Sequence, residues 1–369
     1  MASAGRISSL ESVRGLAALT VCLFHACYIR YMGMPLVAKT SPLEILLNGH
    51  GAVVLFFVLS GYVLRSSLGR SARVRPFSLA FRYLVARVFR LFPVIIATSA
   101  LFVSLAWALG GQPPQFGNLF RNALLLDVSI NGAFWTLQVE VFGSLLVLAS
   151  YLIEERFGLW PVFVATAGLL PMSFMGHSNL IFGTINSGLF YTFLVGYLVA
   201  ALPLPEVKSS PYAALILCLA LTAFYWAHVR GDIFKQWLLF ITTLSAAIIV
   251  FIFSNDRFRN SLQWKPVRLL GALSYSYYAL HPLGIELAQH LAPTIAQHDP
   301  ARWKVVAALF VVSAGVAFVL SIAMNYAVER PGISVGRVIT GATKRRLRLT
   351  DPTMERASGV LARRPDISS

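Results

Sequence analysis

Several charged or titratable side chains lie inside stretches of sequence that are otherwise almost entirely apolar. Arg14 and His25 share the first such stretch and are 11 residues apart, about three turns of an α-helix, so both fall on one helix face. Glu140 and His281 lie within later apolar stretches. Because a charge at bilayer depth is costly, such residues usually mark a functional site. A histidine working with a carboxylate is a common arrangement for general acid–base catalysis.

A pair of arginines adds an anion-binding signal. Arg87 and Arg90 are three residues apart, so they share a helix face, and Arg90 reaches a full turn into an apolar run. Paired guanidinium groups bind phosphate well because each presents a planar fork of donors. The alternative interpretation is that these arginines only anchor a helix at the cytoplasmic surface.

Each of the other residues also has a structural interpretation. Arg14 could extend from a helix end to the lipid headgroups, and His25 could be satisfied by a neighbouring helix. Glu140 could form a salt bridge within a helix bundle. The ring of Pro282 frees backbone carbonyls next to His281, and such breaks in membrane helices usually line cavities rather than lipid.

The elements that carry these residues are predicted to be membrane-spanning helices. The chain has 369 residues, of which 57% are hydrophobic and 12% charged, whereas soluble domains are about 45–50% apolar and about 25% charged. A spanning helix needs about 20 mostly apolar residues. The stretches that satisfy this condition are 9–29, 45–64, 84–109, 133–152, 159–176, 181–202, 211–228, 237–254, 269–290 and 303–327. We therefore expect an all-α integral membrane protein with about ten transmembrane helices.

The positions of the basic residues predict the orientation of these helices. If the N-terminus is cytoplasmic, 24 of the 31 Lys and Arg fall on the cytoplasmic side and seven on the other. Cytoplasmic segments of membrane proteins carry such an excess, so both termini are predicted to be cytoplasmic. Residues 1–330 form the predicted transmembrane domain, and the polar, basic residues 331–369 are predicted to form a disordered cytoplasmic tail.

The composition argues against several other classes of protein. The formal net charge of +16 comes from residues between apolar runs and in the tail, which indicates membrane topology rather than nucleic-acid binding. The three cysteines all lie in apolar runs, which argues against a disulfide scaffold or a cysteine zinc cluster. No metal-ligand spacing or glycine-rich phosphate loop is present, so we expect no metal.

Six short motifs occur in an order that resembles a known family. They are Arg14-x10-His25, LFFVLSGY (55–62), RVFRLFP (87–93), WTLQVE (135–140), SYSYYALHP (274–282) and VERP (328–331). Together they are similar to the motifs of the acyltransferase-3 family, multi-span bacterial membrane enzymes that O-acylate exported or surface glycans. The resemblance covers residues 6 to about 331. It implies a ten-helix core that takes an acyl group, commonly acetyl, from cytoplasmic acyl-CoA.

The resemblance also implies roles for single residues. Arg14 and His25 match the family's arginine–histidine pair, Glu140 the acidic end of its tryptophan motif, and His281 the histidine of its Ser-Tyr-Ser motif. Acyl transfer to a hydroxyl needs a base, and His25 fits because unperturbed imidazole titrates near neutral pH. Glu140 would orient this imidazole as the second catalytic residue. The predicted donor-binding residues are Arg14, Arg87, Arg90 and His281.

These assignments lead to one main function and one alternative. We expect an O-acyltransferase of the bacterial cytoplasmic (inner) membrane whose partners are acyl-CoA, a glycan or glycolipid acceptor and the bilayer. Direct transfer is favoured because no serine or cysteine is obviously placed as a nucleophile, while an acyl-histidine intermediate stays open. The alternative is a multi-span transporter that uses the intramembrane Arg, His and Glu residues as a proton or ion relay.

Overall fold

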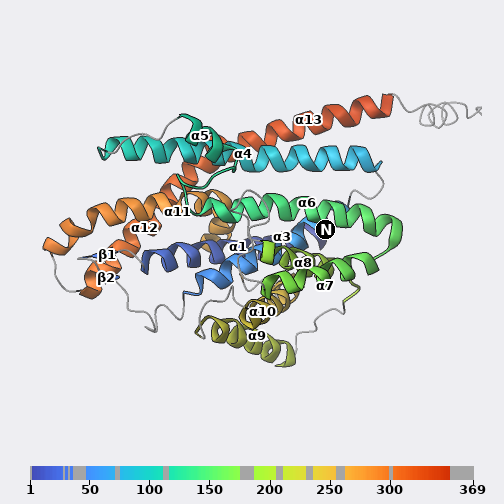
Figure 1. The fold of residues 1–369 in the computed structure, drawn as a ribbon, viewed down its shortest axis with the longest axis horizontal. Helices are drawn as coiled ribbons and strands as arrows, with labels where there is room; N and C mark the ends of the chain where they lie inside the picture. Colours follow the sequence, from blue (N-terminus) through green and yellow to red (C-terminus); the bar gives the residue numbers. More distant parts are fainter. Residues whose placement is uncertain are drawn as a thin grey trace, which may run out of the picture.

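A computed structural model describes most of the chain, and nearly all of the described residues are helical (Figure 1). The described residues are 2–27, 30–31, 34–35, 47–70, 75–110, 116–174, 187–204, 211–229, 236–254, 262–298 and 302–349. Within them, the strands β1 (Arg30–Tyr31) and β2 (Met34–Pro35) form one short antiparallel ribbon. The predicted all-α fold is confirmed.

Each of the ten predicted spans coincides, wholly or in part, with a helix. The corresponding helices are α1 (Ala2–Cys27), α3 (Gly49–Gly69), α4 (Pro76–Ala108), α6 (Phe134–Phe157), α7 (Trp160–Phe174), α8 (Phe190–Ala201), α9 (Pro211–Val229), α10 (Gln236–Ser254), α11 (Lys265–His298) and α12 (Arg302–Met324). The remaining helical elements are α5 (Phe116–Ala123), the single turn η1 (Ser187–Leu189), the π-helical turn η2 (Asn325–Glu329) and α13 (Arg330–Leu349).

Seven candidate spans in the described part of the chain are long and apolar enough to cross a membrane. They lie in α1, α3, α4, α6, α9 and α10 and in the continuous stretch from α12 into α13. The helices α7 and α8 are apolar but shorter. The helix α11 is long, but serine, tyrosine and histidine interrupt its apolar residues. The chain is therefore a multi-pass helical membrane protein, and the number of ten spans stays a prediction.

A glycine contact brings α1 and α11 together. A side chain at Gly15 would collide with the backbone of Gly271, and one at Gly271 would collide with the carbonyl of Glu11. Small residues allow such close packing of helices in membranes. His25 and His281 each follow their glycine by ten residues, so α1 and α11 run parallel from this crossing point to the two histidines. Parallel directions are what two odd-numbered spans, the first and the ninth, require.

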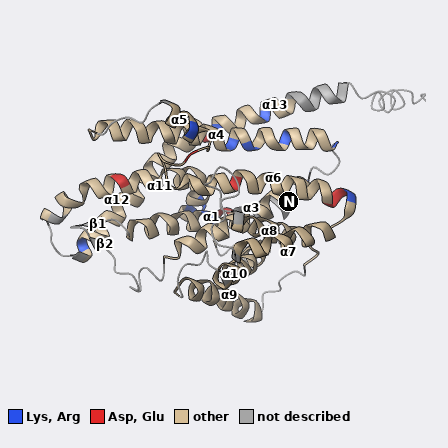
Figure 2. Cartoon of the chain, in the orientation of Figure 1, with Lys and Arg blue, Asp and Glu red and all other residues tan. Residues whose placement is uncertain are grey.

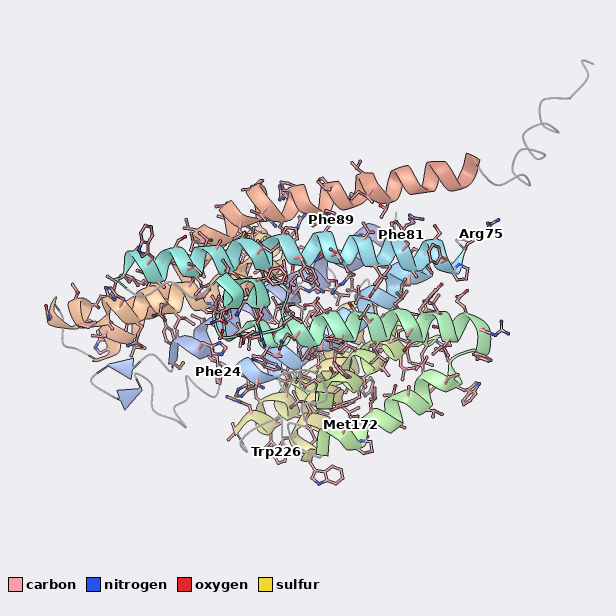
Figure 3. All side chains as sticks on the ribbon, turned by 45° about the horizontal axis from the view of Figure 1, so that its top comes forward. Phe24, Arg75, Phe81, Phe89, Met172 and Trp226 are labelled. Carbon is pink, nitrogen blue, oxygen red and sulfur yellow. The ribbon has the colours of Figure 1, made fainter. Side chains whose placement is uncertain are left out.

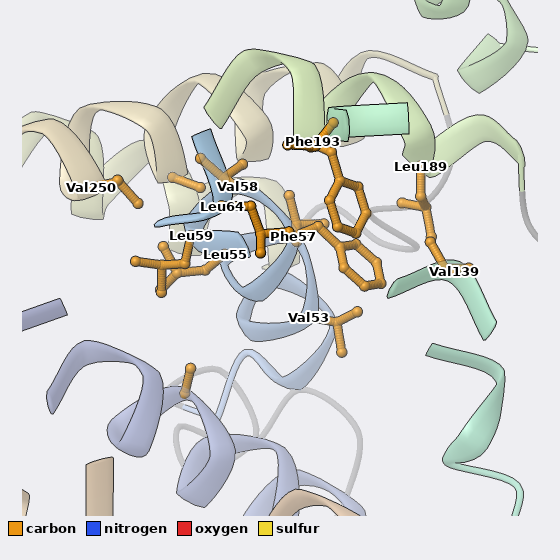
Figure 4. Packing of buried hydrophobic residues seen from close by; sticks show 14 of the residues in the cluster. Val53, Leu55, Phe57, Val58, Leu59, Leu64, Val139, Leu189, Phe193 and Val250 are labelled. Atoms are coloured by element: carbon orange, nitrogen blue, oxygen red, sulfur yellow. The ribbon is translucent and has the colours of Figure 1, made fainter. Parts of the chain in front are cut away.

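The main hydrophobic core surrounds α3 and α8. These two helices pack together as closely as α1 and α11 do. Gly61 faces the carbonyl of Phe193, and Gly196 faces the carbonyl of Val58, so neither position has room for a side chain. The rings of Phe57 and Phe193 stack with centroids 5.0 Å apart (Figure 4). This core gives the bundle a rigid centre against which α1 and α6 pack.

The helices α4 and α13 lie side by side along one face of the bundle (Figure 1). Gly332 approaches the carbonyl of Phe89, and Gly336 approaches the Phe89 side chain, which lies between the two helices in Figure 3. Figure 2 shows basic residues along both helices. The prediction of a disordered tail is wrong for residues 331–349, because these glycines let a helix dock on α4. Residues 350–369 lie outside the described residues.

The two described ends of the chain lie toward the same end of the bundle. In Figure 1, α1 starts at the right and runs left, whereas α13 runs toward the right. An even number of crossings produces this arrangement. The assignment of that end to the cytoplasm stays a prediction.

Candidate active site

Two histidines from helices distant in sequence meet at the centre of the site. The rings of His25 on α1 and His281 on α11 stack with centroids 5.2 Å apart, and Nδ1 of His25 lies 3.2 Å from Nε2 of His281. His281 is buried, with 1% of its surface exposed, whereas His25 is exposed within the described part of the chain. One histidine is thus enclosed by protein, and the other can be reached from outside.

A proline determines which nitrogen of His281 carries the proton. In an α-helix the carbonyl of Tyr278 would accept a hydrogen bond from the backbone N–H of residue 282. Residue 282 is proline and has no N–H. Nδ1 of His281 instead lies 2.6 Å from this carbonyl, so Nδ1 must be the protonated donor. In the neutral imidazole, Nε2 of His281 is therefore a hydrogen-bond acceptor.

The tautomer of His25 follows from its two partners. Its Nδ1 lies 3.0 Å from the carbonyl of Val21 and 3.2 Å from Nε2 of His281. Both partners are acceptors, so Nδ1 carries the proton of the neutral ring. Nε2 of His25 then keeps its lone pair on the exposed side of the histidine pair. A general base needs this arrangement.

A small cavity collects three of the predicted residues. Arg14, Arg90 and Glu140 line a space of about 40 Å³, together with Thr136 and Tyr275 among others. Outside the cavity lining, Nη2 of Arg87 forms a salt bridge of 2.8 Å with Oε1 of Glu140. The arginines thus surround a single carboxylate at the junction of α1, α4, α6 and α11.

Among the described residues, no hydrogen bond or ion pair joins Glu140 to His25, its predicted catalytic partner. Its charged partner is Arg87, because α6 presents Glu140 toward α4. The place beside the His25 imidazole is occupied by His281, which the sequence analysis assigned to donor binding. Arg87 is likewise engaged with Glu140, so Arg90 is the member of the arginine pair that lines the cavity.

Tyr278 connects the histidine pair with the cavity. Its ring lies 5.2 Å from the ring of His281, and its hydroxyl is 2.7 Å from that of Thr136 on α6. Thr136 precedes Glu140 by four residues, so both face the same side of α6. Tyr278 is not among the residues predicted from the sequence, although its position four residues before Pro282 marks it as the residue whose carbonyl is freed.

Hydrogen bonds hold α11 in place on both sides of this site. The Tyr275 hydroxyl donates to the carbonyl of Leu91 at 2.8 Å, which fixes α11 against α4. The buried carboxylate of Glu329 accepts from the Ser276 hydroxyl at 2.5 Å and from the Asn325 amide at 2.9 Å. Glu329 belongs to the π-helical turn η2, a type of irregularity that is frequent at functional sites.

The fold and the site define a class: a multi-pass helical membrane protein with a histidine pair beside a cavity that holds two arginines and a glutamate. No group of three or more His, Cys, Asp or Glu side chains in the described ranges could hold a metal ion. The sequence profile of an acyltransferase domain, that of the acyltransferase-3 family, matches residues 7–325. The chain therefore belongs to this family and is an acyltransferase.

Two relatives agree with this assignment. The chain is 23% identical over 330 residues to BcsY of Komagataeibacter xylinus, named as a membrane-bound transacylase, with 78% of this chain and 75% of BcsY covered. It is 25% identical over 359 residues to YrhL of Bacillus subtilis (strain 168), named as a peptidoglycan O-acetyltransferase. That match covers 81% of this chain but only 51% of YrhL, so the chain spans about half of that relative. No solved structure matches the chain.

Proposed function

We propose that this membrane acyltransferase moves an acetyl group from acetyl-CoA to a hydroxyl of an exported or cell-surface glycan, and that it does so in the bacterial cytoplasmic membrane. The observation that carries the proposal is the exposed His25, whose Nδ1 is occupied by two acceptors and whose Nε2 is left with its lone pair. The family assignment favours this chemistry over a proton relay in a transporter.

The basic residues of the cavity supply the donor-binding part of the proposal. Arg14 and Arg90 would contact the phosphates of acetyl-CoA, since guanidinium groups pair well with phosphate. A space of about 40 Å³ holds only a small part of such a donor, so the rest would lie outside the bundle. Arg14 and His25 are separated by roughly 16 Å along α1, which gives the thioester arm a path to the base.

The residues around Glu140 have a supporting role in this scheme. Glu140 neutralises part of the positive charge that three arginines bring into the bundle, and its bond to Arg87 ties α6 to α4. Such a partner stabilises a half-buried charge. We therefore assign Glu140 and Arg87 to the positioning of Arg14 and Arg90, in place of the role beside His25 that the sequence suggested.

The proposed reaction is a direct transfer. Nε2 of His25 removes the proton from the acceptor hydroxyl, while the hydroxyl oxygen attacks the thioester carbonyl. The tetrahedral intermediate then expels the coenzyme thiolate, which takes the proton from Nε2, so an ester and free coenzyme A are formed. During this cycle the imidazolium of His25 keeps its Nδ1–H bonds to the carbonyl of Val21 and to Nε2 of His281. His281 is thus the positioning residue of the base.

The names of the relatives support a glycan acceptor. YrhL is named for transfer to peptidoglycan, and BcsY is named only as a transacylase. A glycan outside the membrane and a donor inside the cell would approach the histidine pair from opposite sides. The parallel course of α1 and α11 is compatible with such access, because both histidines lie ten residues beyond the crossing at Gly15 and Gly271.

A ligand-protection experiment tests the donor. Acetyl-CoA should raise the melting temperature of the purified protein, whereas S-acetylpantetheine, which lacks the nucleotide phosphates, should raise it much less. In parallel, base-labile acetate should increase in envelope glycans of cells that express the protein, but not in cells that express His25→Ala. Equal protection by both thioesters would contradict phosphate recognition, and unchanged acetate in the glycans would contradict the proposed function.

A further inference from the structure

A second cavity, larger than the one at Glu140, lies between α4, α11 and the loop before α6. Its volume is about 580 Å³, within the range of about 300–1,000 Å³ that is typical of ligand pockets. One wall is apolar and comes from α4, and the other is polar and comes from α11 and the loop before α6. The lining residues are Phe102, Val103, Leu105, Ala106, Leu109, Ser129, Ile130, Glu286 and His290.

Both cavities have lining residues on one face of α11. Tyr275, which lines the small cavity, and Glu286, which lines the large one, are 11 residues apart, so they share a helix face about 16 Å apart along the axis. His290 follows Glu286 by four residues and continues this face. On α4, Arg90 lines the small cavity and Phe102, twelve residues later, lines the large one. The proposed donor site and the large cavity thus have two helices in common, α4 and α11.

Glu286 and His290 have no role in the site described above. Both are exposed residues, and Glu286 falls inside the ninth predicted span. A carboxylate facing lipid at that depth would be costly. No hydrogen bond or ion pair within the described residues involves either side chain. Both side chains line the cavity, which places them beside a ligand bound there.

Hydrogen bonds hold the loop that lines the cavity. The amide of Asn131 donates to the carbonyl of Ala279 on α11 at 3.1 Å, which fixes the loop on the helix that carries His281. The Ser129 hydroxyl donates to Asp127 at 2.9 Å, and this hydrogen bond lowers the pKa of the Asp127 carboxyl. Asp127 is consequently ionised at neutral pH and keeps Ser129 at the cavity wall. A prearranged wall reduces the entropic cost of binding.

We propose that this cavity binds a sugar residue of the acyl acceptor, with Glu286 and His290 contacting its hydroxyls. This inference rests on the proposed function. A carboxylate accepts hydrogen bonds from hydroxyl groups, an imidazole can donate or accept them, and the apolar wall of α4 can cover the C–H face of a sugar ring. An anionic ligand is disfavoured by Glu286, and a single carboxylate is a poor site for a metal cation.

The cavity is close to the histidine pair without containing it. Glu286 follows His281 by five residues, a distance of about 7.5 Å along α11, and is rotated by about 140° around its axis. A sugar bound at Glu286 would thus leave a neighbouring unit of the same glycan to reach His25. Enzymes use binding energy from such remote parts of a substrate to orient the reacting group.

The experiment compares acetylation in cells with donor binding by the purified protein. The double variant Glu286→Gln/His290→Ala should lower base-labile acetate in envelope glycans about tenfold or more, as expected when hydrogen bonds to a charged group are lost. Its melting temperature should still rise with acetyl-CoA as in the wild type. The variant Ala106→Trp, which fills the cavity from α4, should have the same effect. Glu155→Gln, at an exposed glutamate near the end of α6, is the matched control and should behave as the wild type.

Two results would overturn the inference. If cells with the double variant contain as much glycan acetate as cells with the wild type, the cavity does not bind the acceptor. If the double variant loses acetate and also loses its protection by acetyl-CoA, the cavity affects the donor or the fold. Failure of the proposed function would give a different result from failure of this inference. Cells that express the wild-type protein would then show no more glycan acetate than cells without the protein.

Discussion

The role of His281 gives the sharpest prediction from the geometry. In His281→Ala, His25 loses one of the two acceptors of its Nδ1–H, while the carbonyl of Val21 at 3.0 Å remains. The tautomer of His25 is therefore retained. What is lost is a hydrogen bond to the imidazolium that forms as the acceptor is deprotonated, and such a charge-assisted bond is worth about 1.5–3 kcal/mol.

This energy corresponds to a loss of about 10–150-fold in kcat. The loss is smaller than the ~10⁴-fold decrease that a wrong histidine tautomer causes in a catalytic triad. The Michaelis constant for acetyl-CoA should not change, since no contact of His281 reaches the arginines. His281→Gln offers an amide oxygen as an alternative acceptor and should recover part of the rate.

The assay is the release of coenzyme A thiol by the protein in phospholipid nanodiscs, with isolated envelope glycans as the acceptor. Two values of kcat for His281→Ala would contradict this role of His281. A loss as large as that in His25→Ala would mean that His281 itself touches the reacting atoms. An unchanged kcat would mean that the histidine stacking is only packing.

Three further predictions concern the bundle. Arg87→Ala removes the charged hydrogen bond to the half-buried Glu140 and should lower the free energy of unfolding by about 1.5–3 kcal/mol, and an unchanged melting temperature would contradict the pairing. Gly271→Val should separate α1 from α11 and abolish activity even if the protein folds; full activity would show that this crossing does not set the distance between the histidines. A cysteine replacing Asn118 should react with an impermeant thiol reagent in intact cells and one replacing Ser67 should not, and the opposite pattern would reverse the predicted orientation.

The helices and several residues of the candidate site could be predicted from the sequence because both depend on local patterns. Apolar runs of sufficient length define spans, and a spacing of 11 residues places Arg14 and His25 on one face regardless of the rest of the fold. Polar residues within such runs stand out because the bilayer makes them costly. The structure accordingly gathers Arg14, Arg90 and Glu140 at one cavity.

The partners of these residues could not be predicted, because they depend on which helices pack together. Glu140 and Arg87 are 53 residues apart, and no local pattern shows that α6 turns this carboxylate toward α4 rather than toward α1. His25 and His281 are 256 residues apart and meet only because Gly15 and Gly271 allow their helices to cross.

Two other features show the same limit. Residues 330–349 form a helix whose glycines pack against Phe89. The basic composition of this segment does not indicate that contact. More could have been predicted from Pro282. Its missing N–H identifies the carbonyl of Tyr278 as the one that the imidazole of His281 now occupies.

The central claim is that Nε2 of His25 is the base of an acetyl transfer, and one measurement tests it most directly. Radiolabelled acetyl-CoA is supplied to the wild type and to His25→Ala in nanodiscs, and the label transferred to isolated envelope glycans is counted. The geometry predicts a loss of roughly 10²–10⁴-fold in His25→Ala, the usual contribution of a general base, with unchanged protection by acetyl-CoA. Transfer at the wild-type rate by a His25→Ala protein that still binds acetyl-CoA would contradict the claim.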